Sequence, residues 1–355
     1  MSRYLKERYQ AMEAYIPGEQ PRDMHYIKLN TNESPYPPAP SVVKVLKETD
    51  MENLRLYSDP TCKVLKEKLA ALYDVKPENL FISNGSDDIL NFIFMAFPGK
   101  NGAIFPDITY GFYTVFADLH GVNYRQIPLK EDFSLNYQDY CNQEALIVIA
   151  NPNAPTGRKI SNGEIEEILK SNPDNVVAID EAYVDFGGES CYPLMEKYDN
   201  LLVVRTYSKS RCLAGGRLGY AIGPAGLIAD LEKIKFSTNP FSINRLTLTI
   251  GEATIDAEDY YQARCADIIA ARDWTTKALE ALGFTVLPSY GNFVFAKSDD
   301  IGGEELYLKL KRRGILVRHF SSPRIRDFNR ITIGTMEQMR KLVETVAEIL
   351  QEGKV

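Results

Sequence analysis

Thr206-Tyr207-Ser208-Lys209-Ser210-Arg211 is the stretch around which the rest of the chain is organised, and it continues through Leu213-Ala214-Gly215-Gly216 to Arg217. The apolar run at 201–204 before it predicts a buried strand. A hydroxyl, a lysine and an arginine therefore leave the end of one strand together. Loss of hydration in a cleft frees a lysine amine to attack carbonyl carbons. Lys209 is thus a candidate nucleophile, although most lysines in loops are merely solvated.

Apolar runs alternate with helical patterns from about residue 80 onward. Repeated strand–helix units predict an α/β fold with a mostly parallel open sheet and helices on both faces. The expected strands cover residues 80–82, 103–105, 122–127, 146–150, 176–179, 201–204 and 218–222, and the expected helices cover 89–97, a segment from about 109, and 162–170.

Two further parts flank this large domain, which we assign to residues 41–280. Residues 1–40 are predicted to form an N-terminal arm, because 29–38 is too proline-rich for a helix and too polar for a core strand. A simple surface strap is the plainer interpretation of that segment. Residues 281–355 alternate strands and helices again and predict a small α+β domain. We expect the arm to return to this small domain or to reach a partner subunit.

Composition and charge narrow the possible partners and locations. The 355 residues are 45% hydrophobic and carry a net charge of −7 without a basic block, which argues against nucleic acid as a partner. No apolar segment reaches membrane-spanning length, so we expect no membrane partner and a cytoplasmic location. The five cysteines and three histidines are scattered, which predicts reduced thiols and no metal site.

The turn Ser83-Asn84-Gly85-Ser86-Asp87-Asp88 connects an expected strand to an expected helix. Gly85 permits an unusual backbone turn, and a helix that begins here offers free N–H groups to an anion such as phosphate. Capping of the helix by Ser86 or Asp87 explains these residues equally well.

A second strand end carries an acid. The run 176–179 leads into Asp180-Glu181-Ala182-Tyr183, and open α/β sheets place their functional residues at such strand ends. A turn or helix cap is the plainer interpretation of Asp180. The neighbouring run 146–150 ends in Asn151-Pro152-Asn153-Ala154-Pro155-Thr156-Gly157, a turn dense with helix breakers.

These motifs, in this order, resemble the pyridoxal-phosphate-dependent aminotransferases of class I and II. The resemblance rests on Asn-Pro-x-x-Pro-Thr-Gly, Asp-Glu-Ala-Tyr and Ser-Lys…Gly-x-Arg, and it spans nearly the whole chain. Within this family the chain looks most similar to the histidinol-phosphate aminotransferases. The residues that carry the narrower resemblance are Leu29-Asn30-Thr31-Asn32-Glu33, Tyr57, Asn84-Gly85-Ser86-Asp87, Thr109-Tyr110 and Arg330-Ile331-Thr332-Ile333-Gly334-Thr335.

The resemblance implies a pyridoxal 5′-phosphate cofactor and a role for each matching residue. Lys209 would hold the cofactor as a Schiff base and move the substrate Cα proton, while Asp180 would pair with the pyridinium nitrogen. Tyr110 would stack on the ring and Tyr183 would reach its phenolic oxygen. The phosphate would lie between Gly85, Ser86, Asp87, Ser208 and Arg217.

The chain departs from the family pattern at Ala154. The family has an asparagine directly before Pro-Thr-Gly, which donates a hydrogen bond to the phenolic oxygen of the cofactor, and alanine cannot donate one. Asn153, one position earlier, could turn inward as a substitute, or Tyr183 could act alone.

The resemblance also implies the reaction and the assembly. Amino-group transfer between histidinol phosphate and 2-oxoglutarate, which yields glutamate, would use Arg330 and Arg318 for the substrate anions and Tyr15 and Asn32 to close over the substrate. A homodimer would place Tyr57 on the neighbour's cofactor phosphate. Threonine-phosphate decarboxylation, aromatic amino-acid transamination and a non-catalytic pyridoxal-phosphate-binding regulator are alternatives. The intact lysine and aspartate count against the regulator.

Overall fold

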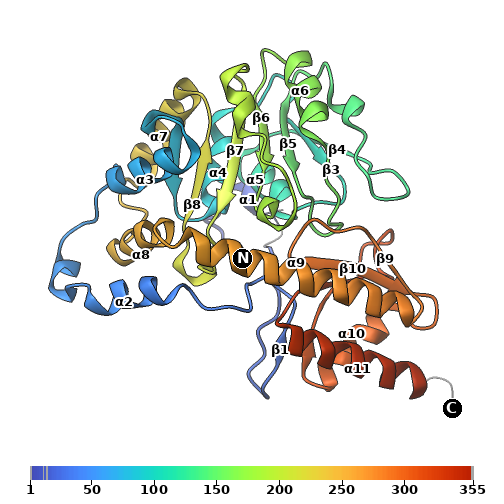
Figure 1. The fold of residues 1–355 in the computed structure, drawn as a ribbon. Coiled ribbons are helices and arrows are strands. Elements are labelled where there is room, and N and C mark those ends of the chain that lie inside the picture. The colour runs from blue at the N-terminus through green and yellow to red at the C-terminus, as the bar shows by residue number, and fades with distance from the viewer. Residues whose placement is uncertain (1, 11, 13–14, 353–355) are drawn as a thin grey trace.

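A computed structural model describes residues 2–10, 12 and 15–352 (Figure 1). Its largest element is a seven-stranded sheet with the order β2-β8-β7-β6-β5-β3-β4. All neighbouring strands are parallel except at β8, which is antiparallel to both β7 and β2. The predicted α/β fold class is therefore confirmed. The strands are β2 (Leu80–Ser83), β3 (Ala103–Pro106), β4 (Tyr124–Ile127), β5 (Leu146–Ala150), β6 (Val177–Asp180), β7 (Leu201–Thr206) and β8 (Gly219–Ile222).

Helices cover both faces of this sheet, because its central strands are apolar on both sides. Alternate strand residues enter two cores: Ile147 and Ile149 of β5 face one, and Val148 faces the other. The first core is closed by α3 (Lys63–Tyr73), α6 (Asn162–Ser171) and α8 (Arg245–Ile255), and the second by α4 (Ser86–Ala96), α5 (Phe112–His120) and α7 (Ala225–Thr238). Helix α7 is not among the helices expected from the sequence.

The C-terminal part forms a smaller antiparallel sheet with the order β12-β13-β10-β9. Helix α9 (Glu258–Ala281) leads into it and contributes Cys265, Ile268 and Leu279 to its core. The predicted division at 280 stays a prediction; it coincides with the end of this helix. The elements are β9 (Phe284–Val286), β10 (Phe293–Ser298), α10 (Gly303–Arg312), β11 (Ile315–Leu316), β12 (Arg318–His319), β13 (Asn329–Thr332) and α11 (Met336–Glu352).

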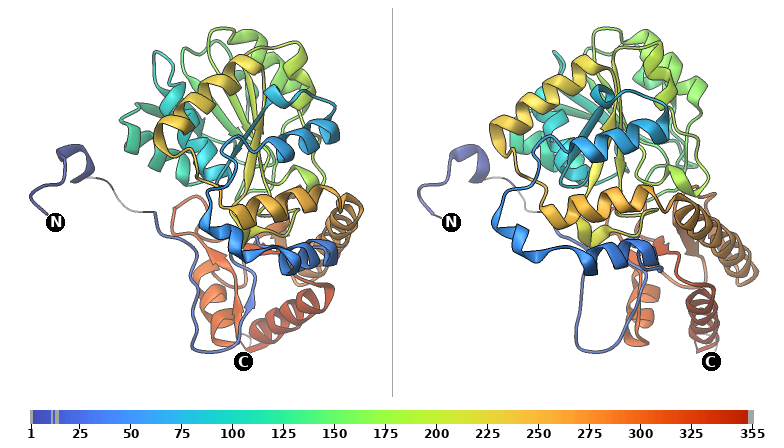
Figure 2. Two further views of the ribbon diagram at one scale, coloured as in Figure 1. Left: turned by 90° about the vertical axis from the view of Figure 1, so that its left-hand side faces the viewer. Right: turned by 60° about the vertical axis from the view of Figure 1, so that its left-hand side comes forward.

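The arm returns to the smaller sheet region of its own chain. Strand β1 (Ile27–Lys28) pairs in parallel with β11, and Leu29 is buried in the adjacent core. The arm then continues into α2 (Pro40–Glu48). At the outer edge of the molecule in Figure 2 lies α1 (Glu7–Gln10), where Arg8 Nη2 donates to the Leu119 carbonyl at 2.7 Å.

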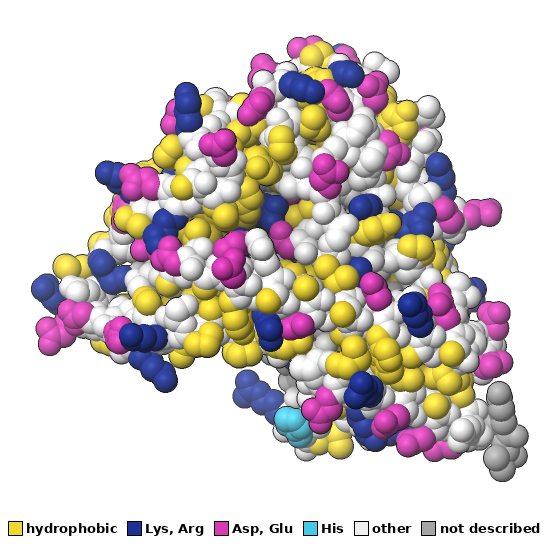
Figure 3. Space-filling model, in the orientation of Figure 1, with side chains coloured by type: hydrophobic (Ala, Val, Ile, Leu, Met, Phe, Trp, Pro, Cys, Tyr) yellow, Lys and Arg dark blue, Asp and Glu magenta, His cyan; other side chains and the backbone are white. Residues whose placement is uncertain are grey.

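Short 3₁₀ helices occupy several connections. They are η1 (Met51–Arg55), η2 (Pro77–Asn79), η3 (Tyr137–Tyr140), η4 (Val184–Phe186), η5 (Tyr192–Glu196) and η6 (Ala214–Gly216). Two of them, η4 and η6, lie close to the site described below. Acidic and basic side chains are interspersed over the face drawn in Figure 3. Over the described residues, no helix has the length and apolar character needed to cross a membrane.

Candidate active site

A cavity of about 380 Å³ lies where β5, β6 and β7 end, beside the first turn of α4. Parallel strands bring their carboxyl ends to one edge of a sheet, so the residues that follow them meet there. Eight of the residues expected from the sequence line this cavity. The full lining is Gln20, Thr31, Glu33, Ser86, Asp87, Tyr110, Ala150, Ala154, Asp180, Ala182, Tyr183, Thr206, Ser208, Lys209, Ala214, Gly215 and Arg217.

Lys209 enters the cavity from the loop after β7. Its Nζ donates to the Thr31 carbonyl at 3.3 Å and lies 5.9 Å from the ring centre of Tyr183. Within the described part of the chain Lys209 is the only lysine in the cavity lining, and it makes no salt bridge with a carboxylate. Its amine is therefore held by a neutral acceptor and is open to a ligand.

Asp180 is buried at the end of β6. Its Oδ2 accepts from the Tyr113 hydroxyl at 2.9 Å and its Oδ1 accepts from the Ala182 amide at 3.1 Å. Burial raises the pKa of Asp180 to about 6, although these two hydrogen bonds oppose the shift. A positive charge brought beside this carboxylate would favour its ionised form.

The turn before α4 lets the Arg217 side chain come close to the backbone. Gly85 has φ +86°, a backbone conformation that favours glycine, and a Cβ there would meet Arg217 Nη2 at 2.7 Å and displace the guanidinium. Gly85 is also the N-cap of α4, and no side chain caps the helix. Ser86 and Asp87 lie inside its first turn, so the expectation that one of them acts as the cap is wrong. The first N–H groups of α4 therefore remain open to an anion.

Arg217 lies across this turn. Its Nη2 forms a salt bridge with Asp87 Oδ2 at 3.2 Å, and its Nη1 lies 3.5 Å from Ser208 Oγ. The other oxygen of Asp87 accepts from the Tyr110 hydroxyl at 2.7 Å. Asp87, Arg217 and Ser208, three side chains expected at the phosphate, are thus linked to one another, and Asp87 joins them to Tyr110, which is expected on the ring.

Asn32 joins the arm to the cavity. Its Nδ2 donates to the Tyr183 hydroxyl at 2.9 Å, and its Oδ1 accepts from Thr332 Oγ1 at 3.0 Å. The side chain is buried and the backbone adopts φ +55°, a conformation that asparagine tolerates. The arm therefore places Asn32 between the Tyr183 ring and the smaller sheet.

Asn153 is not brought into the cavity. Its Nδ2 donates to the Ile108 carbonyl and to Thr156 Oγ1, both at 2.9 Å, and its Oδ1 accepts from Thr109 Oγ1 at 2.7 Å. Both amide hydrogens are used, one by Ile108 outside the turn and one by Thr156 within it, and Ala154 lines the cavity instead. This geometry favours the alternative in which Tyr183 acts without an asparagine, and we do not carry Asn153 into the proposal below.

Arg330 and Arg318 lie on neighbouring strands of the smaller sheet, directly opposite one another in the register of β13 and β12. The Arg330 guanidinium is 5.6 Å from the Phe293 ring centre, and its Nη2 donates to the Asn30 carbonyl at 3.1 Å. Its Nε is buried without a partner. Burial lowers the pKa of Arg330, and the charge of Arg318 adds to this effect. Neither arginine is paired with a carboxylate of the described residues, so both can receive an anion.

Seven predicted residues lie outside the cavity lining: Gly85, Asn153, Asn32, Arg318 and Arg330, described above, and Tyr15 and Tyr57. The Tyr15 ring packs on Phe112 with 4.1 Å between ring centres, and the Phe112 ring lies 5.6 Å from that of Tyr110. Tyr57 is 78% exposed and stacks on Phe241 at 4.4 Å. Tyr57 does not line the cavity of its own chain.

Sequence reasoning missed three residues at the site. Tyr113 follows Tyr110 by one helical turn, a spacing that could have indicated a shared face. Thr31 and Glu33 lie within the stretch that carries the resemblance, but the local pattern does not show that the arm folds back to Lys209. The pKa of the Glu33 carboxyl is lowered on balance: burial raises this pKa, but the hydrogen bonds from Lys28 and Thr31 outweigh burial.

Comparison with known proteins agrees with this geometry. The family model for aminotransferase class I and II matches residues 24–346. The chain belongs to this family of aminotransferases.

Curated relatives narrow the assignment. A histidinol-phosphate aminotransferase of Brachyspira hyodysenteriae is 50% identical over 353 residues, which cover 99% of this chain and 100% of the relative. One from Marinomonas sp. is 49% identical over 346 residues, covering 96% and 98%. Within its class, the chain belongs to the histidinol-phosphate aminotransferase family.

A solved structure shows the same fold. The histidinol-phosphate aminotransferase of Sinorhizobium meliloti, determined in complex with pyridoxal 5′-phosphate, has a TM-score of 0.89 and 22% identity, and the match covers 99% of each chain. At that identity the likeness concerns the fold alone.

The residues present fit pyridoxal 5′-phosphate. The cavity holds one lysine amine, one buried carboxylate without a cationic partner among the described residues, and an uncapped helix start beside an arginine. These are the three features that this cofactor needs: a carbonyl-reactive amine, a partner for its ring nitrogen, and an anion site.

Proposed function

We propose that this protein transfers an amino group between L-histidinol phosphate and 2-oxoglutarate, with pyridoxal 5′-phosphate as cofactor. The observation that carries the proposal is that the Lys209 amine and the Asp180 carboxylate line one cavity whose far end holds Arg217 and the start of α4. The names of relatives with 44–50% identity over nearly their full length support the choice of substrates.

Lys209 and Asp180 are the proposed catalytic residues. The bound cofactor supplies an electron sink for the substrate carbon that loses its proton. The Lys209 amine, whose only hydrogen-bond partner among the described residues is the Thr31 carbonyl, would accept the substrate Cα proton and carry it during the transfer. The Asp180 carboxylate keeps a negative charge beside the ring nitrogen, and Tyr113 orients that carboxylate.

The phosphate of the cofactor would be held at the start of α4. The open N–H groups of Ser86 and Asp87 attract an anion, and Arg217 adds a charged donor beside Ser208. Gly85 allows the arginine to approach the turn. Tyr110 would cover one face of the ring, and Tyr183 would donate to its phenolic oxygen.

Arg330 and Arg318 are the proposed sites for substrate anions. Histidinol phosphate brings a phosphate and 2-oxoglutarate brings carboxylates, so one pocket must accept both kinds of anion. A planar guanidinium offers paired donors that suit either group. Arg330 is connected to the cavity through the arm, because it contacts Asn30 while Asn32 contacts Tyr183. Tyr15 and Asn32 would close over the substrate.

The working unit would be a homodimer with shared sites. Tyr57 is exposed, and its loop is held by Ser58, which donates to the Ile243 carbonyl, and by Arg245, which donates to the Tyr57 carbonyl. A partner subunit could therefore receive Tyr57 at its cofactor phosphate. A cytoplasmic location belongs to the same proposal, supported by five unpaired cysteines.

Incubation of the purified protein with histidinol phosphate and 2-oxoglutarate tests the proposed reaction. We expect glutamate to form, and to depend on added pyridoxal 5′-phosphate after the cofactor has been removed. Preference for phenylalanine or tyrosine as amino donor would contradict the proposed substrate. Carbon dioxide release from threonine phosphate without glutamate formation would contradict transamination itself.

A further inference from the structure

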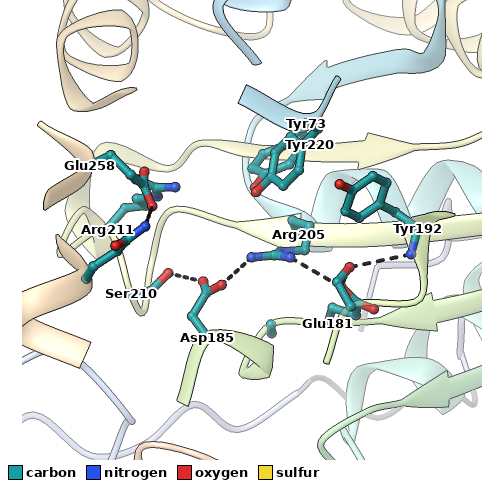
Figure 4. A network of polar contacts seen from close by, with 12 residues as sticks. Tyr73, Glu181, Asp185, Tyr192, Arg205, Ser210, Arg211, Tyr220 and Glu258 are labelled. Carbon is teal, nitrogen blue, oxygen red and sulfur yellow. Dashed lines mark hydrogen bonds and ion pairs between the residues drawn. The ribbon is translucent and has the colours of Figure 1, made fainter. Parts of the chain in front are cut away.

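A chain of polar side chains, buried except for the partly exposed Asp185, does not line the cavity (Figure 4). Arg205 Nη1 contacts Glu181 Oε2 at 3.3 Å, and Arg205 Nη2 contacts Asp185 Oδ1 at 2.5 Å. The other oxygen of Asp185 accepts from Ser210 Oγ at 2.5 Å. We call Glu181, Arg205, Asp185 and Ser210 the Arg205 network. The guanidinium also lies 5.8 Å from the ring centre of Tyr73.

The two ends of the network are neighbours of the two proposed catalytic residues. Glu181 directly follows Asp180, and Ser210 directly follows Lys209. The network therefore connects the end of β6 with the loop after β7 by side chains alone.

This connection begins where the main-chain ladder ends. The register of β6 and β7 stops at Asp180 and Val204, and the Glu181 amide makes one more bond to the Val204 carbonyl at 2.8 Å. Beyond that point β7 pairs only with β8. Among the described residues no main-chain hydrogen bond joins 182–188 to 205–212. Asp180 is therefore fixed within the sheet. The loop of Lys209 has main-chain hydrogen bonds of its own, such as that from the Tyr207 amide to the Leu218 carbonyl, but side chains alone join it to residues 182–188.

The burial of these charges argues for a role beyond stability. A buried ion pair loses hydration energy, so apolar residues of similar size often stabilise a fold as well or better. Arg205 and Glu181 are almost completely buried. Burial opposes ionisation of Asp185, but Arg205 and Ser210 outweigh it and lower the pKa of that carboxyl. A fixed set of charged hydrogen bonds is suited to holding two segments in one geometry.

We propose that Arg205, Asp185 and Ser210 are positioning residues that hold the loop of Lys209 against the end of β6. They set where the Lys209 amine lies relative to Asp180, and none of them lines the cavity. This inference rests on the proposed function, in which the cofactor lies between these two residues.

Two serines of the network region give a matched test. Ser210 Oγ donates to Asp185, and Ser190 Oγ donates to Glu181, both at 2.5 Å. Only Ser210 belongs to the path between Lys209 and Asp180, because Ser190 approaches Glu181 from outside that path. Ser210→Ala and Ser190→Ala each remove one hydroxyl that donates to a carboxylate. The Glu181 side chain is fully buried and the Asp185 side chain is 34% exposed, so Ser190→Ala should lower the free energy of unfolding at least as much as Ser210→Ala.

Binding of pyridoxal 5′-phosphate separates the two variants. We expect Ser210→Ala to weaken the affinity of the cofactor-free protein for pyridoxal 5′-phosphate about tenfold, whereas Ser190→Ala stays within about twofold of wild type. The visible circular dichroism of the bound cofactor should change in Ser210→Ala only, because it reports the orientation of the cofactor in the site.

Arg205→Lys provides a second measurement. Lysine keeps the charge but cannot bridge two carboxylates with a planar fork, so it should change affinity and circular dichroism in the same direction as Ser210→Ala. If the two serine variants alter affinity and circular dichroism equally, the network only stabilises the fold; the positioning proposal is then overturned while the proposed function stands. Failure of the wild-type protein to bind pyridoxal 5′-phosphate would overturn both.

Discussion

The Tyr113 hydroxyl donates a hydrogen bond of 2.9 Å to Oδ2 of Asp180, and both side chains are buried. With the Ala182 amide on Oδ1, each carboxylate oxygen has one neutral donor. No cationic side chain of the described residues forms a hydrogen bond with this carboxyl, and burial raises its pKa to about 6. The protein thus maintains a buried acid in a strand-end site at a cost in solvation, which a positively charged ring nitrogen would offset.

Replacement of this acid should slow transamination. Asp180→Asn keeps the size of the side chain and removes the charge beside the ring nitrogen, so the electron sink weakens. We expect kcat to fall on the order of a hundredfold or more, as when other electrostatic stabilisers are removed. Initial rates of glutamate formation at saturating cofactor measure this. A variant with near wild-type kcat would reduce Asp180 to a structural role.

The same substitution should stabilise the cofactor-free protein at neutral pH. Burial raises the pKa of Asp180 from 3.8 to about 6, so between these values the folded protein binds a proton that the unfolded chain releases. Stability contributed by this group therefore falls as the pH rises from about 4 to 6. Relative to wild type, Asp180→Asn should gain roughly 1–3 kcal/mol in free energy of unfolding between pH 4 and pH 7. Urea unfolding at both pH values tests this; a pH-independent difference would contradict the buried-acid interpretation.

Lys209 should carry the cofactor covalently. Among the described residues Lys209 is the only lysine that lines the cavity. Borohydride reduction of the holoenzyme should therefore fix pyridoxal 5′-phosphate to the peptide that contains Lys209. Lys209→Ala should lose transamination even where some cofactor stays bound noncovalently. Peptide mass spectrometry identifies the modified residue. Modification of the buried Lys235, or of any other lysine, would show the assignment to be wrong.

The parts of this site that the sequence predicts are those with local signals. Apolar runs followed by Lys209 or Asp180 indicate strand ends, and strand–helix alternation brings such ends to one edge. The pairing of Ile27 with Ile315 has no such signal, because it joins segments nearly a chain length apart. The direction of the Asn153 side chain depends on hydrogen bonds to Ile108 and Thr109 that no spacing specifies.

The same limit applies to charged residues. Arg205 lies in the apolar strand β7, where a pattern of buried residues gives no reason for an arginine. Its partners Glu181 and Asp185 come from a different strand end, so the reason for its burial becomes visible only in the fold. A buried charge within a strand could therefore have been identified as an anomaly, but its role could not.

A shared site in a homodimer should be detectable by subunit mixing. In a hybrid of Tyr57→Phe and Lys209→Ala subunits, a site that takes Tyr57 from the partner carries either both lesions or neither. Activity should therefore recover when the two variants are mixed and allowed to exchange. If Tyr57 serves its own subunit, each hybrid site keeps one lesion. Absence of recovery, once exchange has been demonstrated with labelled subunits, would contradict the shared site.

Arg330 should determine how both substrates bind. Its guanidinium has Asn30 as a neutral partner and a buried Nε without any, so a substrate anion would be its first full charge partner among the described residues. A charged hydrogen bond in such a site contributes roughly 1.5–3 kcal/mol, so Arg330→Lys should lower kcat/KM about tenfold to a hundredfold for histidinol phosphate and for 2-oxoglutarate. The visible absorbance of the cofactor at saturation should not change. Arg313→Lys alters a surface arginine paired with Glu352 and is the matched control, with kcat/KM unchanged.

Phosphate-free histidinol separates anion recognition from a general loss of structure. Wild type should use it poorly, and Arg330→Ala and Arg318→Ala should lose little further activity with it, because the group that each arginine binds is already missing. Steady-state kinetics with both amino donors supplies the comparison. An equal loss for histidinol and histidinol phosphate in Arg330→Ala would mean that the arginine supports the pocket without contacting the phosphate, since a contact with the anion must disappear when the anion is absent.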